Sequence, residues 1–188
     1  MAVNNTLRVY FGDEQANLYT IGYLSSDLFQ LLTFSELIEQ HRDRQLEQYF
    51  FAEKRPAYLN RYSKVYRERI KFGKVTDVEK GSVELIVDGI VDTATIIIPF
   101  TVMTAQLLIE RSRQRVTFNV SIDDPKVQQH LDAYKRRVFG KGDEGLETFI
   151  KYLSQKHYDV QAIADRVYDI SKITDQVSNR MARTLKMN

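Results

Sequence analysis

The chain of 188 residues has no cysteine and only three histidines, three prolines and eight glycines. The absence of cysteine excludes disulfides, thiolate zinc sites and cysteine nucleophiles. The histidines, at positions 41, 130 and 157, do not have metal-ligand spacing, so the sequence predicts no metal or other cofactor. Because no nucleophile or phosphate-binding motif is complete, we do not expect an enzyme. The low glycine and proline contents exclude a collagen-like or linker-dominated architecture.

Apolar residues make up 43% of the chain, and 27 Lys and Arg nearly balance 25 Asp and Glu. This apolar fraction is high enough to bury a core against the entropy of ordering the chain, so we do not expect a disordered protein. The length fits one compact domain, or a small domain with an appended helical element. The first residues lack the basic and apolar regions of a secretory signal, which favours an intracellular protein.

The N-terminal part predicts a hairpin followed by a helix. Residues 6–11 and 17–24 are rich in aromatic and branched side chains and flank a turn sequence, so they predict paired strands. The Ser-Ser-Asp run ending at Asp27 offers an N-cap, and the apolar residues that follow at steps of three and four predict an amphipathic helix to about residue 51. Residues 41–43 (His-Arg-Asp) match part of a kinase loop, but we expect them on the solvent-exposed face of this helix.

A second hairpin is predicted further along the chain. From about residue 62 the apolar period changes to two, and residues 79–82 (Glu-Lys-Gly-Ser) have the composition of a turn. The strand after this turn begins at Val83. A helix that begins at Ser82 is the alternative, and the sequence leaves both open.

Residues 54–74 form a basic stretch. They carry eight basic side chains against a single acid, Glu68, for a net charge of +7, whereas the rest of the chain sums to −5. Such segregation creates a local positive field that attracts a polyanion or an anionic lipid surface, and tyrosines within it are suited to stack on bases. The alternative is a solvated strand face that pairs with acids elsewhere. The predicted anion-binding or nucleic-acid-binding residues are Lys54, Arg55, Tyr58, Arg61, Tyr62, Lys64, Arg67, Arg69, Lys71 and Lys74.

The segment 89–109 is 21 residues long and contains one charged residue, Asp92. About 20 apolar residues suffice to cross a bilayer, so the segment predicts a membrane span. On a helix, Asp88, Asp92 and Thr95 lie on one polar stripe, and several copies around an axis would place that stripe in a cation channel, so we predict these residues as pore-lining. The alternative, which stays open, is the buried central helix of a soluble protein, with Asp92 beside a buried basic partner.

The C-terminal third predicts self-association. Residues 116–122 alternate as in a strand, and the chain after the glycine-rich loop at 140–145 has a helical pattern. Two seven-residue series, three residues apart, run from Val160 to Thr184, which is the pattern of a coiled-coil or bundle seam. Because seam side chains are buried against a partner helix, we expect a homo-oligomer. Its predicted interface residues are Ile163, Val167, Ile170 and Val177.

Residues 80–85 (Lys-Gly-Ser-Val-Glu-Leu), followed by the apolar segment, resemble small bacterial single-span membrane effectors of anti-phage systems, of the Hailong channel-subunit type. The resemblance covers about residues 66–110. It implies an oligomeric channel gated by a nucleic-acid-like ligand, which a partner nucleotidyltransferase supplies as an oligonucleotide.

These patterns predict an α+β fold with N-terminal β-hairpins plus a helix, a long central apolar helix and a helical C-terminal third. We expect a small α/β part with the basic stretch (1–81), the long apolar helix (82–115), and a strand followed by a helical oligomerisation region (116–188). The predicted function is an oligomeric effector or channel subunit in antiviral defence, gated by an anionic, nucleic-acid-like ligand, in the bacterial inner membrane with cytoplasmic portions. The alternative is a soluble, cytoplasmic oligomer that binds nucleic acid or serves as an adaptor.

Overall fold

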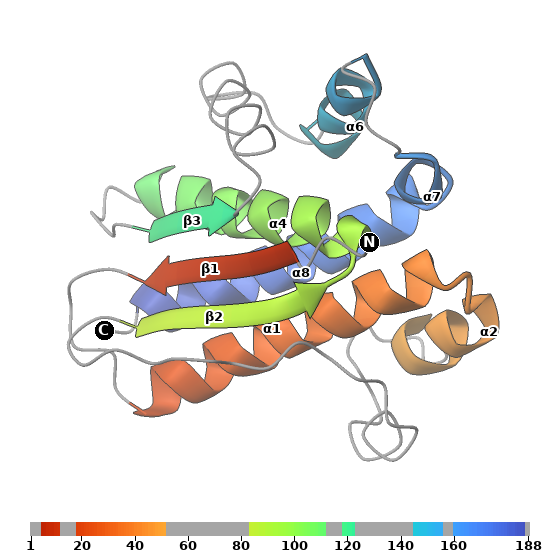
Figure 1. The fold of residues 1–188 in the computed structure, drawn as a ribbon. Helices are drawn as coiled ribbons and strands as arrows, with labels where there is room; N and C mark the ends of the chain where they lie inside the picture. The colour runs from red at the N-terminus through yellow and green to blue at the C-terminus, as the bar shows by residue number, and fades with distance from the viewer. Residues whose placement is uncertain are drawn as a thin grey trace.

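The computed structural model describes residues 5–11, 18–51, 83–111, 118–122, 145–155 and 160–186 (Figure 1). The elements in chain order are β1 (Asn5–Phe11), α1 (Leu18–Glu39), α2 (Asp43–Leu46), the π-helical segment η1 (Glu47–Phe51), β2 (Val83–Ile90), α4 (Asp92–Arg111), β3 (Phe118–Ile122), α6 (Gly145–Gln155), α7 (Gln161–Ala164) and α8 (Val167–Lys186).

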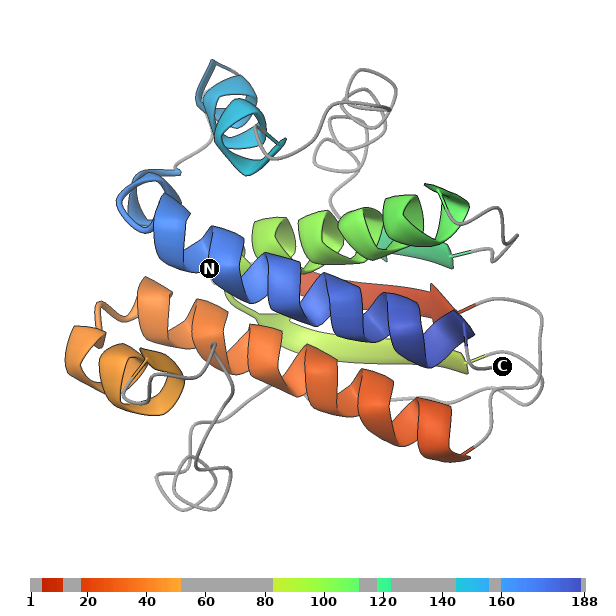
Figure 2. The ribbon, with the colours of Figure 1, turned by 180° about the vertical axis from the view of Figure 1, so that it is seen from behind.

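The three strands form one small antiparallel sheet in the order β2-β1-β3. Its register pairs Val9 of β1 with Leu85 on one side and with Val120 on the other. Successive residues of a strand lie on opposite faces of a sheet. Accordingly Val9 is fully buried, whereas its neighbour Arg8 is exposed. Figures 1 and 2 show why: helices α1 and α4 pack on one face of the sheet, which is the face of Val9, and α8 lies on the far side of these two helices.

The core lies between this sheet and helices α1 and α4, and between these two helices and α8. Helix α8 runs antiparallel to α1 and packs against both α1 and α4 (Figure 2). Each helix contributes apolar residues at steps of three and four, which bring them onto one face. Residues of the three helices that are at most 1% exposed include Leu31, Phe34, Ile97, Ile170 and Val177. Full burial of such a side chain contributes roughly 1.5–3 kcal/mol to the free energy of unfolding, so the contacts among these three helices hold the fold together.

Two contacts at the end of α1 position the elements that follow it. The amide of Arg42 donates to the carbonyl of Leu37 (2.9 Å) and the amide of His41 to that of Ile38 (3.0 Å), which is the Schellman pattern of a helix C-terminus. His41 takes the left-handed conformation that this motif requires, with φ 51°. The carboxylate of Glu39 accepts from the amide and the hydroxyl of Thr93, so the end of α1 caps the start of α4.

The expected α+β class is wrong, because the described residues are mostly helical and the strands form only one small sheet. The main error is at residues 17–24, which were expected to pair with residues 6–11. They begin helix α1 instead, and β1 pairs with β2 and β3. The apolar spacing of α1 extends back from Leu28 to the buried Leu24, and packing on α8 outweighs the β-propensity of this segment.

The apolar helix also begins later than expected. Residues 83–90 form strand β2, and α4 starts at Asp92 rather than at residue 82. The period-two pattern of this segment, paired along β1, decides between the two interpretations that the sequence left open. Further along, β3 spans Phe118–Ile122, where a strand was expected over residues 116–122.

Candidate functional site

The basic stretch, which is the main predicted binding site, lies outside the described residues. This applies to all ten of its predicted contacts, from Lys54 to Lys74. Its support is therefore the charge count of the sequence alone. The nearest described residue is Phe51, at the end of η1, which is partly buried and packs on the core.

The predicted pore-lining stripe does not exist as a helical face. Asp88 is a residue of strand β2, where its backbone is paired with Thr6 of β1. Asp92 is exposed in the first turn of α4. Thr95 is 7% exposed, and its hydroxyl donates to the carbonyl of Asp92 (2.6 Å). The stripe fails because the strand period continues to residue 90, so the three residues do not share one helix.

Helix α4 is long and apolar enough to cross a membrane, and it is the one such helix among the described residues. In this fold, 72% of its apolar window is buried inside the molecule. Asp92, which was expected either in a pore or beside a buried basic partner, is exposed in this fold. Its carboxylate is instead at a helix N-terminus, where the helix dipole favours negative charge.

The predicted oligomer seam is packed within the chain. Ile163, Ile170 and Val177 are at most 2% exposed and belong to the same core as α1 and α4, and the partly buried Val167 packs against it. The expected role of these residues at an interface between copies is therefore corrected. The heptad pattern indicates that one face of α8 is buried, and the surface that buries it is intramolecular.

The α1–α8 interface contains a buried ion pair that the sequence did not reveal. Asp27 is fully buried, and its Oδ1 accepts from the guanidinium of Arg180, which also donates to Oε1 of Gln30 (2.7 Å). Among the described residues, no group donates to the second oxygen of Asp27, Oδ2. Burial raises the pKa of Asp27 from 3.8 to about 6, although Arg180 acts in the opposite direction. The charged form of this carboxylate is therefore disfavoured where it lies.

A second ionic cluster holds the α2 region against the start of α8. Arg166 pairs with Asp43 of α2 and with Asp169 of α8 (3.1 Å), and it approaches Glu47 of η1 at 3.8 Å. Partial burial lowers the pKa of Arg166, but the hydrogen bonds that its guanidinium donates to Asp169 and Asp43 outweigh burial and raise it. Three carboxylates thus surround one guanidinium at this end of the molecule.

Three tyrosines are the exposed large apolar residues among the side chains that the structure describes. They are Tyr19 (55% exposed), Tyr23 (42%) and Tyr168 (72%). Tyr19 and Tyr23 are neighbours on the first turns of α1, with ring centroids 4.4 Å apart. A side-chain hydrogen bond with Tyr23 raises the pKa of Tyr19 above its usual value. The ring of Tyr168 has the ammonium of Lys172 3.9 Å from its centroid.

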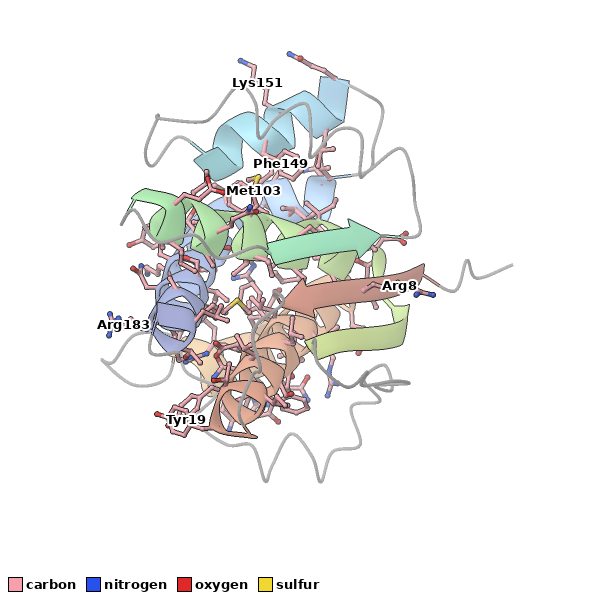
Figure 3. The ribbon with its side chains drawn as sticks, turned by 90° about the vertical axis from the view of Figure 1, so that its left-hand side faces the viewer. Arg8, Tyr19, Met103, Phe149, Lys151 and Arg183 are labelled. Carbon is pink, nitrogen blue, oxygen red and sulfur yellow. The ribbon has the colours of Figure 1, made fainter. Side chains whose placement is uncertain are left out.

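The sequence did not indicate the pair of Tyr19 and Tyr23, because residues 17–24 were expected to form a strand of a hairpin. Figure 3 shows Tyr19 and Arg183 on the same side of the molecule, from α1 and α8, and Arg8 on the opposite side, beyond the sheet. No group of acidic and histidine side chains within the described ranges is arranged to hold a metal ion. No family model, no curated protein and no solved structure matches this chain.

Proposed function

We propose that the protein is a soluble nucleic-acid-binding module, in which residues 54–74 bind the phosphate backbone and α4 is the central helix of the core. The observation that carries this choice over a channel is the burial of α4 within a single chain. A channel subunit would need α4 to face lipid or other copies.

The exposed side of helix α8, which packs on α4, indicates that α4 is in a protein surrounded by water and not by lipid. Helix α8 covers α4 with Ile170 and Val177, and its other side exposes Lys172, Asp175 and Arg183. Charged side chains that face lipid find no polar partners in the hydrocarbon. A helix with a charged outer side, such as α8, therefore does not separate a membrane-spanning helix from lipid. The covering of α4 is thus amphipathic, as in the core of a soluble protein.

The charge distribution of the sequence supports nucleic acid as the ligand. A net charge of +7 over residues 54–74 stands against −5 for the rest of the chain. A basic stretch with interleaved tyrosines suits a single strand of nucleic acid, because its phosphates need positive charges and its bases need a surface to stack on. Within it, Arg67, Arg69 and Lys71 alternate with other residues, so on a strand they share one face and act together.

The first experiment is fractionation of the expressed full chain. We expect it in the supernatant without detergent. A protein that sediments with membranes and needs detergent for extraction would overturn the proposal in favour of the membrane effector.

The second experiment measures binding to single-stranded oligonucleotides as a function of salt. Replacing Arg67, Arg69 and Lys71 with alanine should weaken binding and flatten the plot of log K against log salt by about 2, because each lost phosphate contact contributes about 0.7. The matched control removes three exposed charges elsewhere, through Arg44→Ala, Lys151→Ala and Lys172→Ala. Equal losses in both triple variants would show that only net charge matters, which contradicts a defined site.

A further inference from the structure

The paired tyrosines of α1 form an exposed aromatic surface on an otherwise well-packed molecule. The rings of Tyr19 and Tyr23 are tilted by 48° to each other and are both exposed, while the residues that follow them, from Leu24 onward, contribute to the core. Exposed aromatic side chains that gather in one place typically mark a contact surface.

Helix α8 has an exposed basic residue, Arg183, near its C-terminal end. Between residues 18 and 35, helix α1 has one carboxylate, Asp27, which is buried and paired with Arg180.

The ion pair fixes which residues of the two helices are adjacent. Helices α1 and α8 are antiparallel, and Asp27 pairs with Arg180. The residue one turn before Asp27 on α1 is therefore at the same height as the residue one turn after Arg180 on α8. This alignment places Arg183 at the level of Tyr23, on the side where Figure 3 shows Arg183 and Tyr19. Exposed aromatic rings and a guanidinium on one side of a molecule are complementary to bases and a phosphate.

The third exposed tyrosine differs in what already covers its ring. The ammonium of Lys172 lies 3.9 Å from the ring centroid of Tyr168, so a base that approaches this ring meets a surface already in contact. Tyr168 is also a single exposed ring, whereas Tyr19 and Tyr23 form a pair.

We propose that Tyr19, Tyr23 and Arg183 form a second contact for single-stranded nucleic acid, in which bases stack on the tyrosines and Arg183 binds a phosphate. This inference rests on the proposed function of the chain, and it uses residues separate from the basic stretch. Single-stranded rather than duplex nucleic acid is the ligand, because stacking on side chains needs bases that are not covered by their own neighbours.

The test measures binding of a fluorescein-labelled 15-nucleotide oligothymidylate to the full chain, with a duplex of equal length for comparison. Tyr19→Ala with Tyr23→Ala should weaken binding of the single strand by about 5- to 150-fold for each base that loses its stack, with little change in the salt slope. Tyr19→Phe with Tyr23→Phe keeps the rings and should bind within about twofold of the original. Arg183→Ala should weaken binding and flatten the salt slope by about 0.7.

Tyr168→Ala is the matched control, because it removes a more exposed tyrosine whose ring is already covered by Lys172. It should bind like the original chain. An unchanged affinity of the double alanine variant, or an equal loss in Tyr168→Ala, overturns the inference. So does a double alanine variant that dissociates an oligomer in sedimentation, because a second copy would then occupy the surface.

The outcomes separate this inference from the proposed function. If the original chain does not bind the oligonucleotide at all, both are wrong. If it binds and only the tyrosine variants are without effect, the stacking contact is wrong and the basic stretch stands. If the basic triple variant is without effect while the tyrosine variants weaken binding, the assigned site is wrong and the stacking contact stands. Melting temperatures of all variants identify any loss that comes from unfolding.

Discussion

Replacing Asp27 with asparagine should make the protein more stable at neutral pH, although it removes one partner of an ion pair. The pKa of Asp27 is raised from 3.8 to about 6 with Arg180 already in place. The favourable effect of the guanidinium is thus included in that value, and the burial of the charge still outweighs it. The difference corresponds to about 3 kcal/mol between the charged and the neutral carboxyl in the folded protein.

The sign of the pH dependence follows from the same pair of values. Because the folded state binds the proton more tightly than the unfolded state, the contribution of Asp27 to stability is fully present below about pH 4. It is lost as the pH rises through 6, so the free energy of unfolding falls by about 3 kcal/mol over this window. Asparagine resembles the neutral acid, keeps an oxygen for Arg180 and does not titrate.

Denaturant unfolding at pH 4 and pH 7.5 measures the effect. Asp27→Asn should match the original chain at pH 4, exceed it by up to about 3 kcal/mol at pH 7.5 and lose the part of the decline that Asp27 contributes. Arg180→Met should cost about 3–5 kcal/mol at pH 7.5, because it leaves a buried carboxylate without a partner, and less at pH 4.

Asp43→Asn is the control for this prediction, because Asp43 also pairs with an arginine, Arg166, but its side chain is 66% exposed. Exposed pairs contribute little, so we expect a change below about 1 kcal/mol and no gain at neutral pH. An Asp27→Asn variant that is less stable at pH 7.5, and that keeps the full decline with pH, would refute the reasoning. The ion pair would then be net stabilising in its charged form.

Three further substitutions test other parts of the fold by denaturant unfolding. His41→Gly should raise the free energy of unfolding by about 0.5–1 kcal/mol, because glycine accepts the positive φ without strain, whereas His41→Ala should give no gain. Asp92→Asn should lower it by only about 0.3–1 kcal/mol, the value of a charge at a helix N-terminus, and a loss of 3–5 kcal/mol would show a buried pair. Ile170→Ala should cost about 2–5 kcal/mol and leave the sedimentation coefficient of the native chain unchanged, since Ile170 is buried within one chain.

The hydrophobic periods in the sequence predicted which face of a helix is buried better than they predicted which element buries it. The seven-residue series through Ile170 and Val177 indicated a buried face on a helix, and α8 has that face. A period states that a face is covered, and it carries no information on whether the covering helix belongs to the same chain. The seam was therefore assigned to a second copy, while in the structure α1 and α4 cover it.

The same distinction explains the missed ion pair. In the sequence, Asp27 ends a Ser-Ser-Asp run, which is a strong local signal for a helix N-cap. Its partner Arg180 is 153 residues away, so no window of the sequence contains both. Once residues 18–24 are helical, Asp27 is in the interior of α1, where it cannot cap, and a basic residue on α8 becomes the compensation that burial requires.

The central helix shows why apolar length alone does not distinguish a membrane span from a core. Both need about 20 apolar residues, because lipid and a protein interior select the same side chains. The neighbours of the helix differ, since a span in lipid needs neighbours with apolar outer faces, whereas a core helix needs amphipathic ones. Helix α8 contributes Ile170 and Val177 to α4 and keeps Lys172 and Asp175 exposed. The information on the environment of α4 therefore lies in the period of α8, far along the chain, and not in the sequence of α4 itself.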